Sequence, residues 1–229
     1  FIVGTGRCGS TMLSRMLYQH PEVLSISEFF SMVCDAGGRI PALFPESPVS
    51  GQAFWELITA ITPQLTTTLR HDVSMAEIIY PFGSKTARYT RQTGVPVISL
   101  TTLSQLSDDP DALLKLLCES VSSRPEASIA EHYLLLFAQL RDHFSRRVWV
   151  ERSGGAFVFI KEVAKLFPDA RYIHIVRDGR DTACSMQNHV GFRIFGIGTM
   201  LTQMLGVQPF YNSDRSNIDR VPEHLQAFL

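Results

Sequence analysis

The chain has 229 residues, of which 45% are hydrophobic and 19% charged, so it can bury a core and is neither a disordered nor a fibrous protein. The 21 basic and 22 acidic residues leave a net charge of -1, which gives no global attraction to nucleic acid or to anionic membranes, and no apolar run approaches the roughly 20 residues of a transmembrane segment. The four cysteines, Cys8, Cys34, Cys118 and Cys184, form no Cys-x-x-Cys pair, which argues against a zinc site or a dense disulfide framework and favours a reducing, cytoplasmic compartment.

The first thirty residues predict a strand, a glycine turn, a helix and a second strand. Residues 1–3 are an apolar run, residues 4–11 are rich in glycine, and residues 12–17 place apolar side chains at helical spacing. Residues 23–26 are typical of a short strand, which would place Glu28 at its end.

The middle of the chain predicts a surface loop followed by helices. Three prolines argue against regular structure across residues 39–51. Helical periodicity marks residues 52–70 and 108–145, the latter as two helices, while residues 95–100 fit a strand. We therefore predict a helical insertion over roughly residues 52–145.

The last third again alternates strands and helices. We predict a strand at residues 148–150, a helix over residues 155–167, a buried strand at residues 172–176, and a helix from Asp178. This alternation indicates an α/β fold of three layers, with a central, mainly parallel sheet and a P-loop-like architecture. We expect residues 1–229 to be a single domain that lacks residues at both ends, and residues 191–229 show no assignable pattern.

The glycine-rich turn lies where a phosphate could bind, between a strand and the start of a helix. The nucleotide-kinase pattern G-x-x-x-x-G-K-[ST] fits Gly4, Gly9 and Thr11, but Ser10 occupies its lysine position. Arg7 offers a planar cation within the same loop. The alternative is a tight turn that binds no ligand.

A second candidate segment follows the predicted strand at residues 172–176. It places Arg177 at the carboxyl end of that strand and Ser185 two helical turns later, so the two could hold a phosphate monoester. The alternative is a solvated surface turn. We expect Asp178 and Asp181 to form salt bridges rather than bind a metal, and the histidines show no metal-ligand spacing.

Together the two segments resemble those that bind 3′-phosphoadenosine-5′-phosphosulfate (PAPS) in sulfotransferases, especially the tyrosylprotein type and related bacterial enzymes. The first segment of that family reads approximately Pro/Gly-Arg-Ser-Gly-Thr-Thr. Here it is matched by Gly6, Arg7, Gly9, Ser10 and Thr11, with Cys8 in place of serine. The resemblance implies that residues 6–11 hold the 5′-phosphosulfate and that Arg177 and Ser185 bind the 3′-phosphate.

Two further stretches carry the resemblance. Residues 20–23 followed by Glu28 resemble the family's His-Pro-(Asp/Glu)-Val segment, which implies that Glu28 is the catalytic base. Arg152 lies where the family has the lysine of Lys-Thr-Pro, which implies that it neutralises the transferred group, although Gly154 departs from the pattern. The alternatives are a solvated glutamate and a structural arginine.

The resemblance implies a sulfotransferase that moves a sulfuryl group from PAPS to a hydroxyl or amine by in-line displacement, releasing 3′,5′-adenosine bisphosphate. We expect Glu28, Arg7 and Arg152 to be catalytic, with no metal. The alternatives are a P-loop kinase or NTPase, which would need Mg²⁺, and a noncatalytic nucleotide-binding module.

The resemblance leaves the acceptor open, as a small molecule or a biopolymer. Five aromatic residues could either line an apolar acceptor pocket or pack in the core: Phe29, Phe30, Phe44, Phe54 and Trp55.

Overall fold

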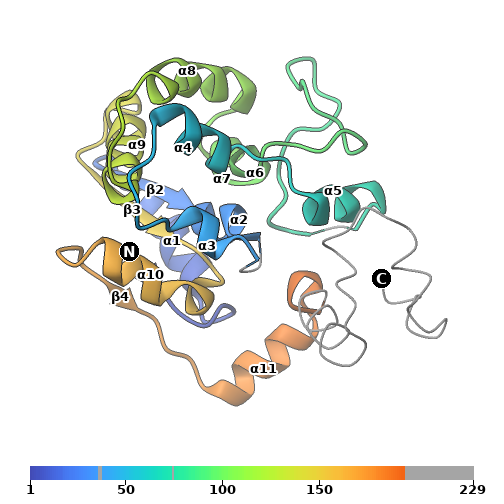
Figure 1. The fold of residues 1–229 in the computed structure, drawn as a ribbon. Coiled ribbons are helices and arrows are strands. Elements are labelled where there is room, and N and C mark those ends of the chain that lie inside the picture. Colours follow the sequence, from blue (N-terminus) through green and yellow to red (C-terminus); the bar gives the residue numbers. More distant parts are fainter. Residues whose placement is uncertain (36–37, 74, 194–229) are drawn as a thin grey trace.

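The computed structural model describes residues 1–35, 38–73 and 75–193, and its centre is a parallel sheet of four strands (Figure 1). The strands are β1 (Ile2–Val3), β2 (Val23–Ser27), β3 (Val148–Arg152) and β4 (Ile173–His174). They lie in the order β2-β3-β1-β4, and every neighbouring pair is parallel. The predicted α/β class with a mainly parallel sheet is therefore confirmed.

Helices make up most of the rest. They are α1 (Ser10–Tyr18), α2 (Phe29–Val33), α3 (Ile40–Leu43), α4 (Gly51–Ile58), α5 (Pro63–Arg70), α6 (Val97–Leu100), α7 (Thr102–Leu106), α8 (Pro110–Ser122), α9 (Ile129–His143), the 3₁₀ helix η2 (Ala156–Val158), α10 (Ile160–Leu166) and α11 (Gly179–Gln187). Helices α4, α5, α8 and α9 match the predicted helical stretches. In the described ranges, no helix is both long and apolar enough to span a bilayer.

The chain crosses the sheet in both directions, which produces three layers. From β1 it passes over β3 to reach β2 through α1, and from β3 it passes over β1 to reach β4 through α10. Right-handed crossovers that run in opposite directions put their helices on opposite faces of a sheet. Helices α7 and α9 contact β2 and β3, and Figure 1 shows α4, α7, α8 and α9 grouped together at one side of the sheet.

On one face, small hydroxyl residues join α1 to the sheet. The buried Ser14 of α1 lies 2.8 Å from Ser25 Oγ and 3.5 Å from Ser27 Oγ of β2. Small side chains let the helix approach closely, and each hydroxyl has a partner. The predicted helix is confirmed, but its buried face carries serines, while Met12 and Met16 are 68% and 64% exposed.

The other face is covered by an aromatic core. Phe30 is fully buried, and its ring contacts those of Phe44, Tyr133 and Phe159 at centroid distances of 5.8, 5.2 and 5.7 Å. Tyr133 is also buried, and its hydroxyl donates a hydrogen bond to Leu43 O at 3.0 Å. Four of the five aromatic residues proposed above, Phe29, Phe30, Phe54 and Trp55, are buried members of this core, and Phe44 packs against it.

Two predictions for the middle of the chain are wrong. Residues 95–100 are not a strand, because α6 occupies Val97–Leu100 as a buried turn of helix after Pro96. Periodicity cannot separate a short buried strand from a short buried helix. Residues 39–51 are not wholly irregular, because α3 contains Pro41, which a helix accommodates in its first turn.

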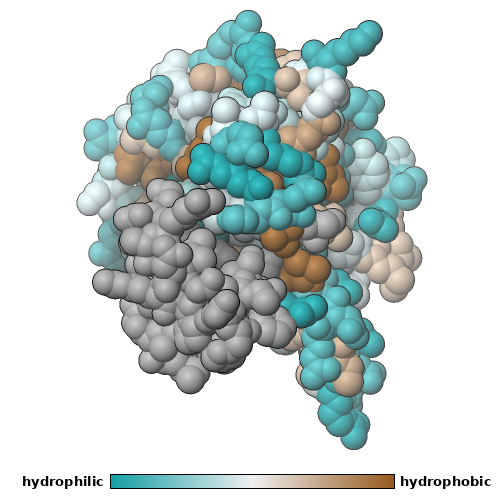
Figure 2. Space-filling view, turned by 90° about the vertical axis from the view of Figure 1, so that its right-hand side faces the viewer, coloured by the Kyte–Doolittle hydropathy of each residue, from teal (hydrophilic) through white to brown (hydrophobic). Residues whose placement is uncertain are grey.

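Two further predictions fail near the end of the described chain. The strand at residues 172–176 shrinks to the two residues of β4 and is not buried, since Ile173 is 49% and Val176 77% exposed. β4 is the edge strand beyond β1, and α11 extends away from it as a mostly hydrophilic projection (Figures 1 and 2). The helix predicted over residues 155–167 is divided at Phe159 into η2 and α10. Most of residues 191–229, from 194 onward, lies outside the described residues.

The aromatic core predicts the cost of removing Phe30. We expect Phe30→Ala to lower the free energy of unfolding by about 3–5 kcal/mol, because a fully buried ring leaves a cavity. Phe157→Ala is the matched control, and since this ring is 48% exposed its cost should be about 1 kcal/mol or less. Denaturant unfolding of both variants measures the difference, and equal costs would contradict the assignment of Phe30 to the core.

Candidate active site

The candidate residues gather where the four parallel strands end. Gly4 follows β1, Glu28 follows β2, Ser153 follows β3, and Arg177 comes shortly after β4. Because the strands are parallel, their carboxyl ends share one edge of the sheet. The crossovers leave β1 and β3 in opposite directions, and ligands of open α/β sheets bind at such a switch point.

The loop between β1 and α1 has a backbone suited to an anion. Gly6, Arg7 and Gly9 have φ values of 76°, 52° and 97°, in the left-handed region. Arg7 is the unfavourable member, since a side chain at positive φ costs on the order of 1 kcal/mol. Gly9 is the N-cap of α1 and provides no side-chain cap, so the first N–H groups of the helix are left without a capping side chain, as a bound anion would require.

The two predicted phosphate-binding segments meet. Arg7 Nε donates a hydrogen bond to Ser185 Oγ at 3.1 Å, and Arg177 Nη1 donates to Arg7 O at 3.1 Å. The three residues border a cavity of about 630 Å³, which we call the arginine cavity. It is lined by Arg7, Gly9, Ser10, Thr11, Met12, Arg15, Met16, Gln19, Arg177 and Ser185.

The arginine cavity suits an anion of some size. Among the residues that the structure describes, its lining has three arginines and no carboxylate. Sequence reasoning had not assigned Arg15, Gln19, Met12 and Met16 to a site, although helical spacing from Thr11 puts Arg15 and Met12 near the loop. The two exposed methionines give the cavity an apolar part beside its charged part.

Two residues of the predicted phosphate loop, Cys8 and Gly6, pack against neighbouring main chain. Cys8 is 7% exposed and packs against Gly4, where an added Cβ would come within 2.7 Å of its sulfur, and it is not among the described residues that line the arginine cavity. A Cβ on Gly6 would lie 2.6 Å from Gly154 O and 2.5 Å from the Phe192 ring. Glycine at position 6 therefore lets the loop pack directly against Gly154.

Glu28 and Arg152 form a buried ion pair. Their side chains are 8% and 6% exposed, and Arg152 Nη1 donates to Glu28 Oε1. The second carboxylate oxygen, Oε2, accepts from Gly154 N at 2.9 Å, and Arg152 Nη2 donates to Ser27 Oγ at 2.8 Å. Glu28 also has a positive φ of 57°. The Arg152 guanidinium is thus paired with the Glu28 carboxylate.

A second cavity, of about 180 Å³, lies beside this pair, and we call it the apolar cavity. The surface of this cavity is mainly hydrophobic, with some polar side chains. Its lining residues are Glu28, Ser31, Met32, Cys34, Asp35, Gln64, Leu65, Thr68, Met75, Glu77, Gly154, Gly155, Phe157, Val158, Phe159, His189, Gly191 and Phe192. Gly154 connects the two parts of the site, because its N–H binds Glu28 and its carbonyl lies against Gly6 of the phosphate loop. Sequence reasoning had no signal for this cavity, since its residues come from separate stretches.

Glu151, next to Arg152 in β3, was also missed. It faces the aromatic core, is 2% exposed, and accepts hydrogen bonds from Ser153 Oγ at 2.6 Å and from Phe30 N at 3.3 Å. Ser153 Oγ in turn accepts from Ser31 N at 3.0 Å. Burial raises the pKa of Glu151 to about 7. This network fixes the turn that carries Gly154.

The residues considered as metal ligands have other roles. Asp178 caps α11 by accepting from Arg180 N at 2.9 Å and pairs with the Arg180 guanidinium, and these bonds lower the pKa of Asp178 to about 2. His132 is fully buried, and its Nε2 lies within hydrogen-bond distance of Val49 O, at 2.8 Å. Across the described ranges, no three His, Cys, Asp or Glu side chains cluster as metal ligands.

Comparison with known proteins agrees with this geometry. Residues 1–222 match the family model described as "Sulfotransferase family", so the chain belongs to the sulfotransferase family. The family assignment makes the protein a transferase of sulfuryl groups. No curated protein and no solved structure gave a significant match.

The buried Glu151 predicts a pH-dependent stability. Because its pKa rises from 4.5 to about 7 on folding, the neutral carboxyl favours the folded state below pH 4.5, and this stabilisation is lost as the pH rises through 7. Between pH 4.5 and 8 the wild type should therefore lose about 3 kcal/mol of unfolding free energy that Glu151→Gln does not lose. Denaturant titrations at both pH values test this, with the exposed Glu119→Gln as control. A difference between wild type and Glu151→Gln that stays constant with pH would contradict the raised pKa.

Proposed function

We propose that the protein transfers a sulfuryl group from PAPS to a hydroxyl or amine acceptor, with Glu28 as the base. The observation that carries this proposal is that Arg7, Arg177 and Ser185 contact one another, while Gly154, which binds Glu28, packs against Gly6 of the same loop as Arg7. Anion-binding groups and a carboxylate thus border one another through Gly154. This is the arrangement that an activated sulfate donor and a nucleophile would need.

The positive charge of the arginine cavity and its volume of about 630 Å³ support PAPS as its ligand. Arg177 and Ser185 would bind the 3′-phosphate, the first by charge-assisted hydrogen bonds and the second through its hydroxyl. Residues 6–11 and the start of α1 would hold the 5′-phosphosulfate through main-chain N–H groups. PAPS would supply a sulfuryl group on a good leaving group, 3′,5′-adenosine bisphosphate.

On the acceptor side, Glu28 is placed to remove a proton. Its carboxylate lines the apolar cavity and is anchored by Arg152 and by Gly154 N, which leaves its position little freedom. A fixed base that meets the acceptor hydroxyl as its oxygen attacks sulfur accelerates transfer. We assign Arg152 the role of positioning Glu28, in addition to the charge it brings near the transferred group.

Negative charge that develops on the sulfuryl oxygens would be stabilised by groups already in place. Arg7 and the N–H groups at the start of α1 point to one cavity, and a preorganised set of donors needs little rearrangement during the reaction. The positive φ values of Arg7 and Glu28 fit this view, because strained backbone occurs preferentially at functional sites.

The kinase alternative has less support. A P-loop kinase uses the loop lysine to reach the outer phosphates of ATP, and Ser10 stands at that position with 5% exposure. A noncatalytic binding module would keep the arginine cavity but would have no use for a buried carboxylate that opens onto a second cavity.

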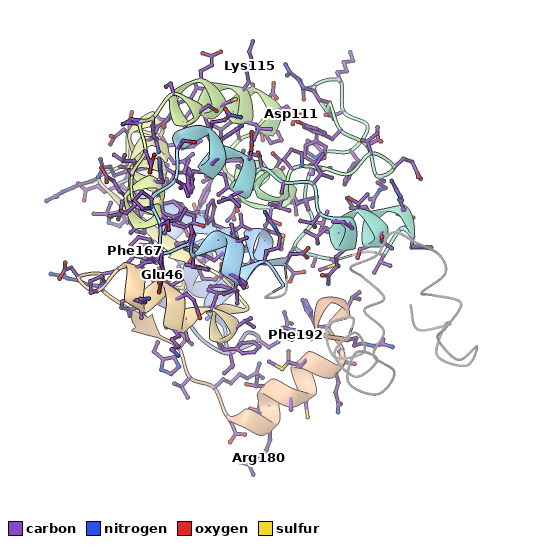
Figure 3. All side chains as sticks on the ribbon, viewed as in Figure 1. Glu46, Asp111, Lys115, Phe167, Arg180 and Phe192 are labelled. Carbon is purple, nitrogen blue, oxygen red and sulfur yellow. The ribbon has the colours of Figure 1, made fainter. Side chains whose placement is uncertain are left out.

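The donor site predicts a loss of affinity in Arg177→Ala. We expect calorimetric titration without metal to give micromolar-class binding of 3′,5′-adenosine bisphosphate to wild type and at least tenfold weaker binding to the variant, because a charge-assisted contact contributes about 1.5–3 kcal/mol. Arg180→Ala is the matched control. It removes an equal charge from the side chain that Figure 3 shows projecting outward from α11, away from the arginine cavity, and it should bind like wild type.

The same titration, with ATP and Mg²⁺ as the ligand, distinguishes the kinase alternative from the PAPS assignment. ATP with Mg²⁺ should bind more weakly than the bisphosphate. Tighter binding of ATP with Mg²⁺, or no bisphosphate binding at all, would contradict the PAPS assignment and favour the kinase.

Glu28→Gln should abolish most turnover without removing the donor site. With labelled PAPS and a panel of phenols, alcohols and amines, we expect kcat to fall by roughly 10²- to 10⁴-fold, the range for losing a general base. Bisphosphate affinity should stay within a few-fold of wild type, which also shows that the variant is folded. Glu46→Gln, at an exposed carboxylate, is the control. Wild-type protein that binds the bisphosphate but transfers to no member of the panel would favour the noncatalytic module.

A further inference from the structure

The polar side chains of the apolar cavity indicate what kind of acceptor it takes. We propose that this cavity binds a compact acceptor that carries a cationic amine, with Glu77 as the residue that binds the amine. The inference rests on the proposed function for its view of Glu28, and it adds a substrate class and a specificity residue at the same site.

The charge of the lining favours a cation over an anion. Three carboxyl residues line the cavity, namely Glu28, Asp35 and Glu77, and the described part of its lining has no lysine or arginine. Arg152 balances Glu28 through their ion pair, and Arg39 attracts Asp35. Glu28 and Asp35 thus each have an arginine that offsets their charge, whereas the partner of Glu77 among the described residues is His189, so Glu77 would attract an ammonium group and repel an anionic acceptor.

Glu77 has one carboxylate oxygen that accepts no hydrogen bond from the described residues. Its Oε1 lies 2.8 Å from His189 Nε2, and the side chains of this pair are 26% and 15% exposed. Its other oxygen, Oε2, is buried and has no hydrogen-bond partner among the described residues. A buried acceptor left unpaired costs about 1–3 kcal/mol, so a ligand that donates a hydrogen bond there regains that energy.

The Glu77–His189 pair is held in place from both sides. Glu77 belongs to the stretch between α5 and α6, where Thr101 Oγ1 donates to its carbonyl oxygen. His189 follows α11, and its ring contacts Phe192 in an edge arrangement at a centroid distance of 5.4 Å. Figure 3 shows Phe192 beside the end of α11, on the side that faces the rest of the fold. The pair therefore joins two segments 112 residues apart across the cavity.

The size and the remaining lining limit the acceptor to a small apolar body. A volume of about 180 Å³ is below the roughly 300–1,000 Å³ of sites for drug-sized ligands. Hydrophobic side chains supply most of the surface, among them Met32, Leu65, Met75, Phe157 and Phe159. A single ring with a short aminated chain has this character, and its hydroxyl could meet Glu28 while its amine meets Glu77.

Three phenols of nearly equal size test the proposal by binding alone. They are tyramine, the neutral 4-propylphenol and the anionic 3-(4-hydroxyphenyl)propanoate, each titrated into protein saturated with 3′,5′-adenosine bisphosphate and followed by NMR. We expect tyramine to bind at least tenfold more tightly than 4-propylphenol, and the propanoate to bind most weakly. In Glu77→Gln, tyramine affinity should fall to that of 4-propylphenol, whose own binding should not change. The exposed Glu126→Gln is the matched control.

Each other outcome has a definite meaning. Equal affinities, tighter binding of the propanoate, or no binding of any of the three would overturn the inference, and the wild-type order decides this even if Glu77→Gln does not fold. Equal weakening of tyramine and 4-propylphenol in Glu77→Gln would make the Glu77–His189 pair a structural clasp and also overturn it. Failure of the bisphosphate to bind would instead count against the proposed function, and the same phenol series without bisphosphate would still test the amine preference.

Discussion

The buried ion pair between Glu28 and Arg152 is the interaction on which the site depends. Removing two charges from water costs several kcal/mol per ion, and their attraction offsets this only when further hydrogen bonds complete the shell. Ser27 Oγ and Gly154 N supply those bonds, at 2.8 and 2.9 Å. The register of the sheet makes the arrangement possible, because Ser27 pairs with Arg152 across β2 and β3, and Glu28 N donates to Arg152 O at 2.6 Å. Loss of either partner would leave an uncompensated buried charge.

Gly154 transmits the position of this pair to the phosphate loop. An added Cβ would lie 3.1 Å from Glu28 Oε1, so a side chain here would crowd the carboxylate, and on its other side the Gly154 carbonyl packs against Gly6. Behind the turn, Glu151 and Ser153 hold the backbone through buried hydrogen bonds. A carboxyl with a raised pKa is therefore part of the support of the site, so its protonation is linked to the stability of the fold.

The sequence could predict those features of the fold and of the candidate site that are determined by short stretches of the chain. The loop after β1, the proposed base Glu28 and the pair Arg177 and Ser185 could be selected as candidates because each depends on a short stretch: glycines that permit positive φ, a strand end, or two turns of one helix. Their roles stay predictions. The errors arose where tertiary packing decides. The apolar run of α6 fits strand and helix equally well, and β4 is shortened and exposed at the sheet edge although its sequence is apolar. Nothing in the sequence distinguishes Glu151 from a solvent-exposed carboxylate on a strand, because its burial depends on the aromatic core that covers it.

The two halves of the site differ in the same way. The arginine cavity is lined mostly by the loop after β1 and by α1, together with Arg177 and Ser185, so a few short stretches of sequence supply its chemical groups. The apolar cavity takes its polar groups from the residues that follow β2, from α5 and the stretch after it, and from the residues after α11, and only the fold brings Glu77 to His189. On the proposed function, substitutions at these distant positions would change the acceptor without disturbing the backbone that holds the donor. A fixed donor loop combined with an adjustable acceptor cavity would let one fold apply one chemistry to many acceptors.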